Sequence, residues 1–461
     1  VFNKDVYIAQ GITTANAAYK KAFNKITSTT SLTSSKYDLA PGSNYRNLYT
    51  SMERAYKYSN CTVIGAEEQI DYQAADKFNI TAGARFDSYN CIPQSTDLAS
   101  PVDKNSYIHG TVLGTTAYYR PEGLEAEFFF VRYNNIGSYF QAQYSPGKKM
   151  NITAGARYDW NSRYGGSFNP RLGIVYQPHT KTTIKLLYGS AFRAPSPSDA
   201  YAQYGSFYTN DSGRTYHSNF LHLPNPGLKP VISHTTELNI QQQLCDNVFV
   251  SVDGYYTALS GLFVYGDDNE TAKLYHNMFY GTPVDYIEVF TNNDRQKTWG
   301  GSIQLNWKGD INDVQINSFA SLSVVGGKNE AGLKEQDEAV KDIQLDFVSP
   351  VMVHAGIDMK WNKFSFAPRL ILMGRQHIAG ISDTTSAVIK RQTLAGYTLV
   401  NISLRYNLSE HFSIYSNMSN ALNQRYKNVS FNNDFNNPNN GLYNGQPQDP
   451  IRVMAGINFT F

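Results

Sequence analysis

Hydrophobic and polar residues alternate with a period of two through much of the chain. In residues 78–88 the apolar set falls on one face: Phe78, Ile80, Ala82, Ala84 and Phe86. The mostly polar set falls on the other face: Asn79, Thr81, Gly83, Arg85 and Asp87. Residues 150–160 repeat this pattern, and NITAGARFD and NITAGARYD are near copies 72 residues apart. Since successive side chains of a strand point to opposite faces, the pattern predicts strands whose two faces meet different surroundings.

The same alternation recurs in residues 351–361, 364–372 and 400–407, always with charges and amides on one face. It also fills the closing stretch PIRVMAGINFTF, which ends at Phe461. We expect this last strand to pair with an early strand and close a barrel, with the terminal aromatic ring at the membrane interface.

The spacing of the turns decides between a soluble sandwich and a membrane barrel. Tight turns are predicted at 73–76, 145–148, 178–181, 245–247, 308–311, 361–363 and 407–410. Long connections fall at about 91–131, 194–230, 261–294, 328–348, 378–391 and 428–449, and the short link at 162–167 is the main exception. Short turns on one rim and long loops on the other are typical of an outer-membrane β-barrel, whose apolar face meets lipid.

The predicted fold is therefore an all-β, transmembrane, antiparallel up-and-down barrel. About 18 strands are counted from residue 24 onward, within a barrel region at 46–461. Residues 1–45 are predicted as loop or early barrel strands, with a short helix considered for Ala15 to Phe23.

Composition excludes several other classes of protein. The chain has 34 Tyr and 25 Phe with a mean hydropathy of −0.42, and no run of about 18 apolar residues predicts a membrane-spanning helix. A net charge of +2 without a basic stripe argues against nucleic-acid binding. Neither a nucleophile elbow, an HExxH motif nor a phosphate loop occurs, so we do not expect an enzyme.

Several motifs, taken in order, make the prediction specific. Residues 139–201 contain GARYD, NPRLGIVY and YGSAFRAPS, residues 225–240 contain NPGLKP and TEL, and residues 418–426 read MSNALNQRY. This succession resembles the barrel of TonB-dependent outer-membrane receptors, although Val231 stands where the family usually has Glu.

The resemblance implies a 22-stranded barrel and an N-terminal plug domain, whose motifs this sequence lacks. Two interpretations follow: a fragment or partial receptor, which we favour, or an atypical barrel without a plug, which would leave an open channel.

The resemblance implies active import in the outer membrane of a Gram-negative bacterium. The ligand would be a scarce nutrient, either cobalamin or an iron chelate such as a siderophore or haem. Implied partners are membrane lipid and lipopolysaccharide, the TonB complex acting through the plug, the small metal chelate and, as a further candidate, a surface lipoprotein. We expect no resident cofactor, although the transported ligand could contain iron. A passive porin-like channel and a barrel-borne adhesin or receptor subunit remain alternatives.

The long loops are expected to bind the ligand, because a rigid barrel holds them over the pore. The candidates are aromatic residues with a few polar groups, suited to a flat or aryl-bearing chelate: Tyr201, Tyr204, Tyr208, Arg214, Tyr216, His217, His222, Tyr265, Tyr275, His276 and Tyr280. Receptors for haem carry a His between the FRAP and NPxL boxes, which makes His217 and His222 candidate haem ligands by resemblance. The run Asp267, Asp268 and Glu270 is a weak Ca²⁺ candidate.

Charged residues on the polar face are interpreted as hydrated lumen groups that face a plug or one another. They are Arg85, Asp87, Arg157, Asp159, Arg405 and Arg452, with the last two considered as a pair. The turn near Ala74 and Ala75 brings Cys61 and Cys91 to the long-loop rim of neighbouring strands, so a disulfide is expected there.

Overall fold

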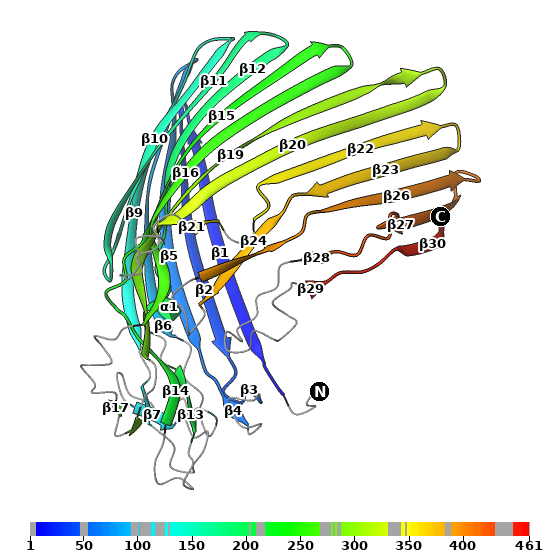
Figure 1. The fold of residues 1–461 in the computed structure, drawn as a ribbon. Helices are drawn as coiled ribbons and strands as arrows, with labels where there is room; N and C mark the ends of the chain where they lie inside the picture. The colour runs from blue at the N-terminus through cyan, green and yellow to red at the C-terminus, as the bar shows by residue number, and fades with distance from the viewer. Residues whose placement is uncertain are drawn as a thin grey trace.

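The computed structural model describes most of the residues of the chain. They are 6–46, 54–93, 101, 112–115, 125–127, 130–201, 204–208, 217–267, 278–279, 282–283, 287–330, 343–345, 348–382, 389–428 and 446–460. One curved sheet dominates the molecule (Figure 1), and a 20-stranded order connects its members.

Seventeen long strands form the wall of the sheet. They are β1 (Gln10–Phe23), β2 (Ile26–Leu39), β5 (Asn60–Ala75), β6 (Phe78–Ile92), β9 (Val131–Gly147), β10 (Met150–Asn161), β11 (Gly165–His179), β12 (Thr182–Arg193), β15 (Val231–Cys245), β16 (Val248–Asp267), β19 (Ile287–Ile311), β20 (Val314–Glu330), β22 (Val351–Trp361), β23 (Phe364–Met373), β26 (Tyr397–Asn407), β27 (Phe412–Ser419) and β30 (Arg452–Phe459). Each pairs antiparallel with the next in this order, which is the predicted up-and-down arrangement.

The remaining elements are short and lie in the connections. They are β3 (Asn44–Tyr45), β4 (Ala55–Tyr56), β7 (Val112–Thr115), β8 (Glu125–Glu127), α1 (Pro197–Tyr201), β13 (Tyr204–Tyr208), β14 (His217–Leu223), β17 (Met278–Phe279), β18 (Thr282–Pro283), β21 (Ile343–Gln344), β24 (Gln376–Ser382), β25 (Ile389–Leu394), β28 (Lys427–Asn428) and β29 (Gln446–Pro447). Within the described residues, no helix is long and apolar enough to cross a membrane.

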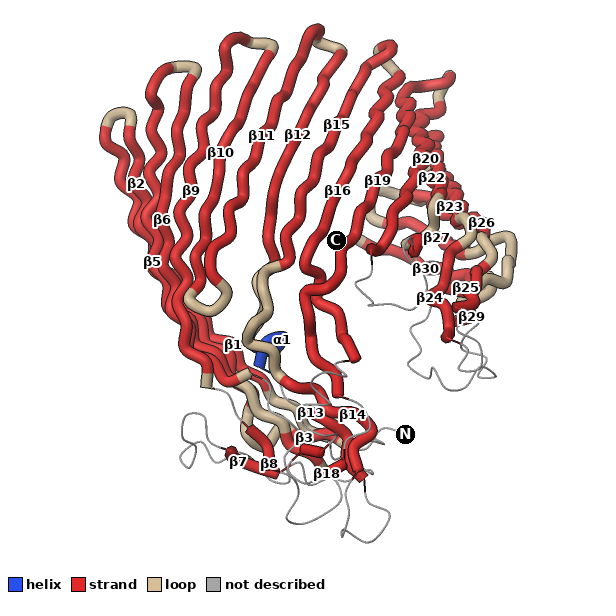
Figure 2. The backbone as a smooth tube through the Cα atoms, turned by 60° about the vertical axis from the view of Figure 1, so that its left-hand side comes forward, coloured by secondary structure: helices blue, strands red, loops and turns tan. Residues whose placement is uncertain are grey.

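The two rims differ as the turn spacing predicted. Figure 2 shows short turns along one rim, while β3, β7, β8, β13, β14 and β18 gather beyond the opposite rim. At most of the short turns the second turn residue accepts a backbone hydrogen bond from the neighbouring hairpin, as Lys25 does from Gln73 and Lys77 from Ser145. One turn was predicted wrongly: β19 continues through 308–311 and turns after Ile311, where Asn312 takes a positive φ of 52° that Asn tolerates.

The N-terminal region supplies two further strands. Residues Ala15 to Phe23 lie in β1 and are strand rather than helix, because β1 pairs with β2 over its whole length. The alanines in this segment make the alternation of apolar and polar residues hard to recognise. The hydrogen-bonded pairing with β2 prevails over the local propensity for helix. From residue 24 onward, where about 18 strands are predicted, the described wall has 16 long strands, and the sheet adds the short members β13, β14 and β21.

The exposed hydrophobic side chains mark the outward face of the wall. Phe86 is 45% exposed, Tyr158 46%, Ile303 48% and Ile457 65%. They alternate with the polar residues of the opposite face, so the large apolar side chains do not form a dry interior. This arrangement agrees with an apolar surface that meets lipid.

The expected closure by the last strand is wrong for the described residues. β30 pairs with β27, and no pairing joins it to β1, which forms the other edge of the sheet (Figure 1). The physical reason is direction: 17 alternating strands make β1 and β30 run the same way, so they cannot close antiparallel with each other. An odd number of further strands between them would restore the even total of such barrels.

Candidate functional site

The near-identical segments of β6 and β10 build the same ion pair twice. Arg85 pairs with Asp87 at 2.7 Å and Arg157 with Asp159 at 2.7 Å. Because the members of each pair are two residues apart, they share a face of one strand. Both carboxylates are almost fully enclosed, with side chains only 5% and 3% exposed.

A glycine on the preceding strand makes room for each pair. Gly65 lies opposite Asp87 in the register, and Gly137 lies opposite Asp159, again 72 positions later. A Cβ at Gly137 would come within 2.6 Å of the Arg157 Nη2, and one at Gly65 would overlap the Asp87 carboxylate. The repeat therefore includes the glycines as well as the charges, which sequence inspection of the NITAGAR segments alone missed.

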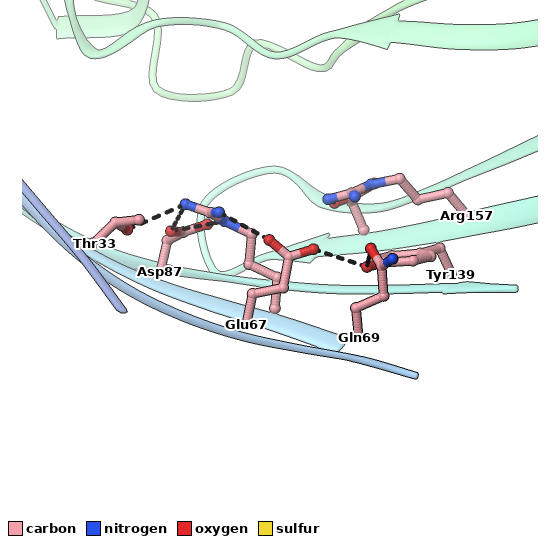
Figure 3. Close-up of polar contacts among 8 residues, drawn as sticks. Thr33, Glu67, Gln69, Asp87, Tyr139 and Arg157 are labelled. Atoms are coloured by element: carbon pink, nitrogen blue, oxygen red, sulfur yellow. Dashed lines mark hydrogen bonds and ion pairs between the residues drawn. The ribbon is translucent and has the colours of Figure 1, made fainter. Parts of the chain in front are cut away.

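A hydrogen-bond network joins the first pair to its neighbours (Figure 3). Arg85 also contacts Glu67 of β5 at 3.2 Å, and the Tyr139 hydroxyl of β9 donates to Glu67 at 2.9 Å. The Arg157 guanidinium lies 5.8 Å from the centre of the Tyr139 ring. Glu67 and Tyr139 were not predicted, because their contacts depend on strand register rather than on spacing within one segment.

A cavity of about 410 Å³ opens above this network, and we call it the rim cavity. The two Arg–Asp pairs line it, Tyr89, Tyr133 and Tyr164 add aromatic rings, and residues of the FRAP segment and the start of α1, Phe192 and Ala194 to Pro197, complete the lining. A second cavity of about 460 Å³ shares Arg157 and Phe192 with it and adds Glu67 and Tyr139. Both volumes are in the range of small-molecule sites.

Arg163 fastens the FRAP segment to the barrel rim. Its Nη2 donates a 2.6 Å hydrogen bond to the backbone oxygen of Pro195. Its guanidinium lies 4.4 Å from the centre of the Tyr133 ring, 5.8 Å from that of Tyr164 and 5.5 Å from that of Tyr201. Burial raises the pKa of the Tyr164 phenol above its usual value. We call Arg163 and these three tyrosines the arginine clamp.

The disulfide lies beside the arginine clamp. Cys61 of β5 and Cys91 of β6 are bonded in the structure, and Cys91 packs in a buried cluster with Val131 and Tyr133. Tyr201, the predicted ligand candidate in α1, packs against this cluster. The clamp thus connects the covalently linked strand ends to the helix that follows the FRAP segment.

A known protein family matches most of the chain. The family described as TonB dependent receptor-like, beta-barrel, matches residues 13–421. The chain belongs to the TonB-dependent receptor family. This membership confirms the resemblance noted from the motifs, assigns the chain to the outer membrane of a Gram-negative bacterium, and agrees with a non-enzymatic protein.

Individual relatives of this TonB-dependent receptor are distant. The vitamin B12 transporter BtuB of Vibrio cholerae is 23% identical over 280 residues, which are 60% of this chain and 36% of that protein. In fold, the outer membrane transporter YddB from Escherichia coli gives a TM-score of 0.66 at 12% identity. The siderophore receptor PirA from Acinetobacter baumannii gives 0.63 at 15% identity. Each of the two structures aligns with 98% of this chain, which spans 63% of theirs.

Only some of the residues predicted to bind the ligand lie in the part of the chain that the structure describes. Tyr204 and Tyr208 lie in β13, His217 in β14, and Tyr265 in β16, where it is opposite Phe290. Other predicted residues lie outside the described part of the chain: Arg214, Tyr216, Tyr275, His276, Tyr280, Asp268 and Glu270. Asp267 ends β16, and the described residues contain no group of three or more possible metal ligands.

His222 is the one predicted haem ligand whose side chain is described. It is only 1% exposed, and its ring lies 5.2 Å from that of Phe290, edge to face. The backbone of β14 pairs in parallel with β19 at this point. This imidazole would have to become accessible before it could bind a haem iron.

The structure does not bring Arg405 and Arg452 together. Both are exposed and lie on the polar face, but β27 separates their strands. Arg405 is level with Tyr415 and Gly456, while Arg452 is level with Ser419. The two arginines lie on the same face of the sheet, but at different levels along their strands and with β27 between them. The predicted pairing is therefore wrong.

Proposed function

We propose that this receptor imports a compact metal chelate, of the cobalamin or ferric siderophore class, across the outer membrane. Family membership supports nutrient import in general. Two relatives give the chemical direction, because one is named as a vitamin B12 transporter and another as a siderophore receptor.

The observation that carries this proposal is the position of the clamped FRAP segment. Residues Phe192 to Pro197 lie at the rim cavity, between the long-loop rim and the charged lumen wall. The arginine clamp holds the segment there by one hydrogen bond and three ring contacts. A chelate that passes from the loops to the lumen would meet aromatic rings first and paired charges next.

The chemistry of the two cavities fits such a ligand. Tyr89, Tyr133 and Tyr164 line the rim cavity, and since Tyr133 stacks on Tyr89 and lies under Arg163, a ligand would meet ring edges, with hydroxyl and amide groups to fix its orientation. The carboxylates already have arginine partners, which leaves no uncompensated charge to repel an anionic chelate. Energy for release would come through TonB acting on a plug domain, which are the partners that the family resemblance implies.

Direct binding by the full-length protein tests the proposal. Purified receptor in detergent would be titrated with cyanocobalamin, a ferric catecholate siderophore, a ferric hydroxamate siderophore and haem, following quenching of protein fluorescence. We expect one cobalamin or siderophore ligand to bind with a Kd below about 1 µM. Arg163→Ala should weaken that binding at least tenfold, whereas Lys181→Ala, on the opposite rim, should leave it unchanged.

Two results would overturn the proposal. One is binding of haem alone among the four ligands. The other is binding of none of them together with a steady ion conductance in a planar bilayer, which would instead identify a passive channel.

A further inference from the structure

Glu68 points out of the barrel wall, unlike its neighbour Glu67. In the ladder between β5 and β6, Glu68 lies opposite Ala84 and shares a face with Ile70 and Phe86. Glu67 lies opposite Arg85 on the polar face. Since Ile70 and Phe86 are 45% exposed each and belong to the apolar surface, Glu68 is a carboxylate on the lipid side.

The position of Glu68 along its strand is central. It is the ninth of the 16 residues of β5, well away from the turn that follows Ala75. Tyr72 and Ile64, both exposed on the same face, lie on either side of it along β5. The carboxylate therefore lies near the middle of the apolar band, where an acidic group is costly and is usually paired.

The contacts of Glu68 within the barrel use about half of the hydrogen bonds that its carboxylate can accept. Ser28 Oγ donates to Oε1 at 2.5 Å, and Thr30 Oγ1 donates to Oε2 at 2.5 Å. An ionised carboxylate accepts about four hydrogen bonds, so roughly two remain to be supplied from outside the wall. Acyl chains have no donors, which makes bare lipid a poor neighbour for this surface.

From β1 to β9, the residues level with Glu68 are polar or small. The ladders align Tyr19, Thr30, Glu68, Ala84 and Ser138, from β1 to β9, and Tyr158 of β10 follows at the same level. The opposite wall differs: Ile303 of β19 is level with Leu322 of β20 and Val353 of β22. We call the first row the outward polar row.

We infer that the outward polar row is an interface with a second copy of this chain in the membrane. A two-fold axis along the membrane normal brings equal depths of two copies together, so each row would meet its own counterpart. The row contains both the acceptor, Glu68, and the hydroxyl donors Tyr19 and Ser138, and is therefore self-complementary. Small residues such as Ala84 allow the two walls to approach closely, as small residues do at helix interfaces in membranes.

Site-directed cross-linking of the full-length protein in isolated outer membranes tests this inference. The exposed free Cys245 would first be replaced, as Cys245→Ser, and a single cysteine then introduced as Ala84→Cys or Ser138→Cys. Ile303→Cys, which is exposed on the opposite wall, is the matched control. With a short bis-maleimide, we expect a species of twice the monomer mass for Ala84→Cys and Ser138→Cys, and at most a tenth of that yield for Ile303→Cys.

Glu68 variants in the Ser138→Cys background test whether Glu68 itself contributes to the interface. Glu68→Leu should lower the dimer yield at least tenfold, and Glu68→Gln, which keeps one acceptor oxygen and adds an amide donor, should retain most of it. Heat-modifiable migration on gels shows that each variant is folded. The inference is overturned by equal yields at Ser138→Cys and Ile303→Cys, by cross-links only to a different polypeptide, or by an unchanged yield in folded Glu68→Leu.

Discussion

Arg163 donates a hydrogen bond from Nη2 to the backbone oxygen of Pro195, 2.6 Å away and 32 positions later in the chain. This contact links the main short connection predicted on the long-loop rim to the FRAP segment. Because the guanidinium also lies over three tyrosine rings, the fixed side chain positions both the segment and α1 beside the rim cavity.

Removing the arginine clamp should loosen the FRAP segment without unfolding the barrel. A hydrogen bond from a charged donor contributes about 1.5–3 kcal/mol, and a partly buried cation–π contact about 1–2 kcal/mol. Arg163→Ala should therefore raise amide hydrogen exchange of residues 194–201 by tenfold or more. Exchange in β15 and β16 serves as the internal control, and equal protection of residues 194–201 in both proteins would contradict the assigned role.

Arg157→Ala should destabilise the receptor substantially, because it leaves the enclosed Asp159 carboxylate without its partner. The expected loss is about 3 kcal/mol in the free energy of unfolding. Lys181→Ala breaks the exposed pair with Asp246, whose side chains are 49% and 90% exposed, and should cost less than about 1 kcal/mol. Guanidinium unfolding followed by tryptophan fluorescence compares the two, and similar losses would be inconsistent with the enclosed geometry.

The disulfide should stabilise the long-loop rim. Cys61 and Cys91 are separated by 30 positions, for which the chain-entropy relation gives about 3–4 kcal/mol as an upper value. The double variant Cys61→Ser, Cys91→Ser should lower the thermal midpoint in reducing-agent-free buffer. Dithiothreitol should lower the midpoint of the parent protein similarly and leave the double variant unaffected; insensitivity of both would show that the rim gains nothing from the bond.

Alkaline pH should weaken packing around Tyr164, which lies between β10 and β11. Burial raises the pKa of this phenol, so the neutral form is favoured in the fold. Its contribution to stability is present below the unfolded pKa of about 10 and is lost as pH rises through the folded value. Difference titration at 295 nm between the parent and Tyr164→Phe should show a phenol that ionises later than free tyrosine. Ionisation at or below pH 10 would contradict its burial.

Alternation within one segment predicted the features that depend on a single strand. The Arg85–Asp87 and Arg157–Asp159 pairs follow from a spacing of two, and the meander follows from the positions of the turns. Contacts between strands could not be obtained this way. Glu67 and Tyr139 meet across β6 only because the ladders align them, and no local pattern states the register.

The remaining failures have separate physical causes. Ala15 to Phe23 contains too few large apolar residues for a period of two to stand out, yet pairing with β2 makes it strand. The family resemblance supplied the receptor assignment, whereas composition and periodicity alone led only to a membrane barrel. Arg163 was missed because its link was treated as a plain turn; an arginine followed by Tyr164, just before the NPRLGIVY segment, was the available signal.

Energised uptake is the most direct test of the account. Cells that carry the full-length receptor as their sole route for the bound chelate would be given radiolabelled cobalamin or ferric siderophore, with and without a protonophore. We predict accumulation that stops when the proton-motive force is dissipated and falls at least tenfold in Arg163→Ala cells. Accumulation at the same rate with the protonophore present would contradict active import and identify a passive pore.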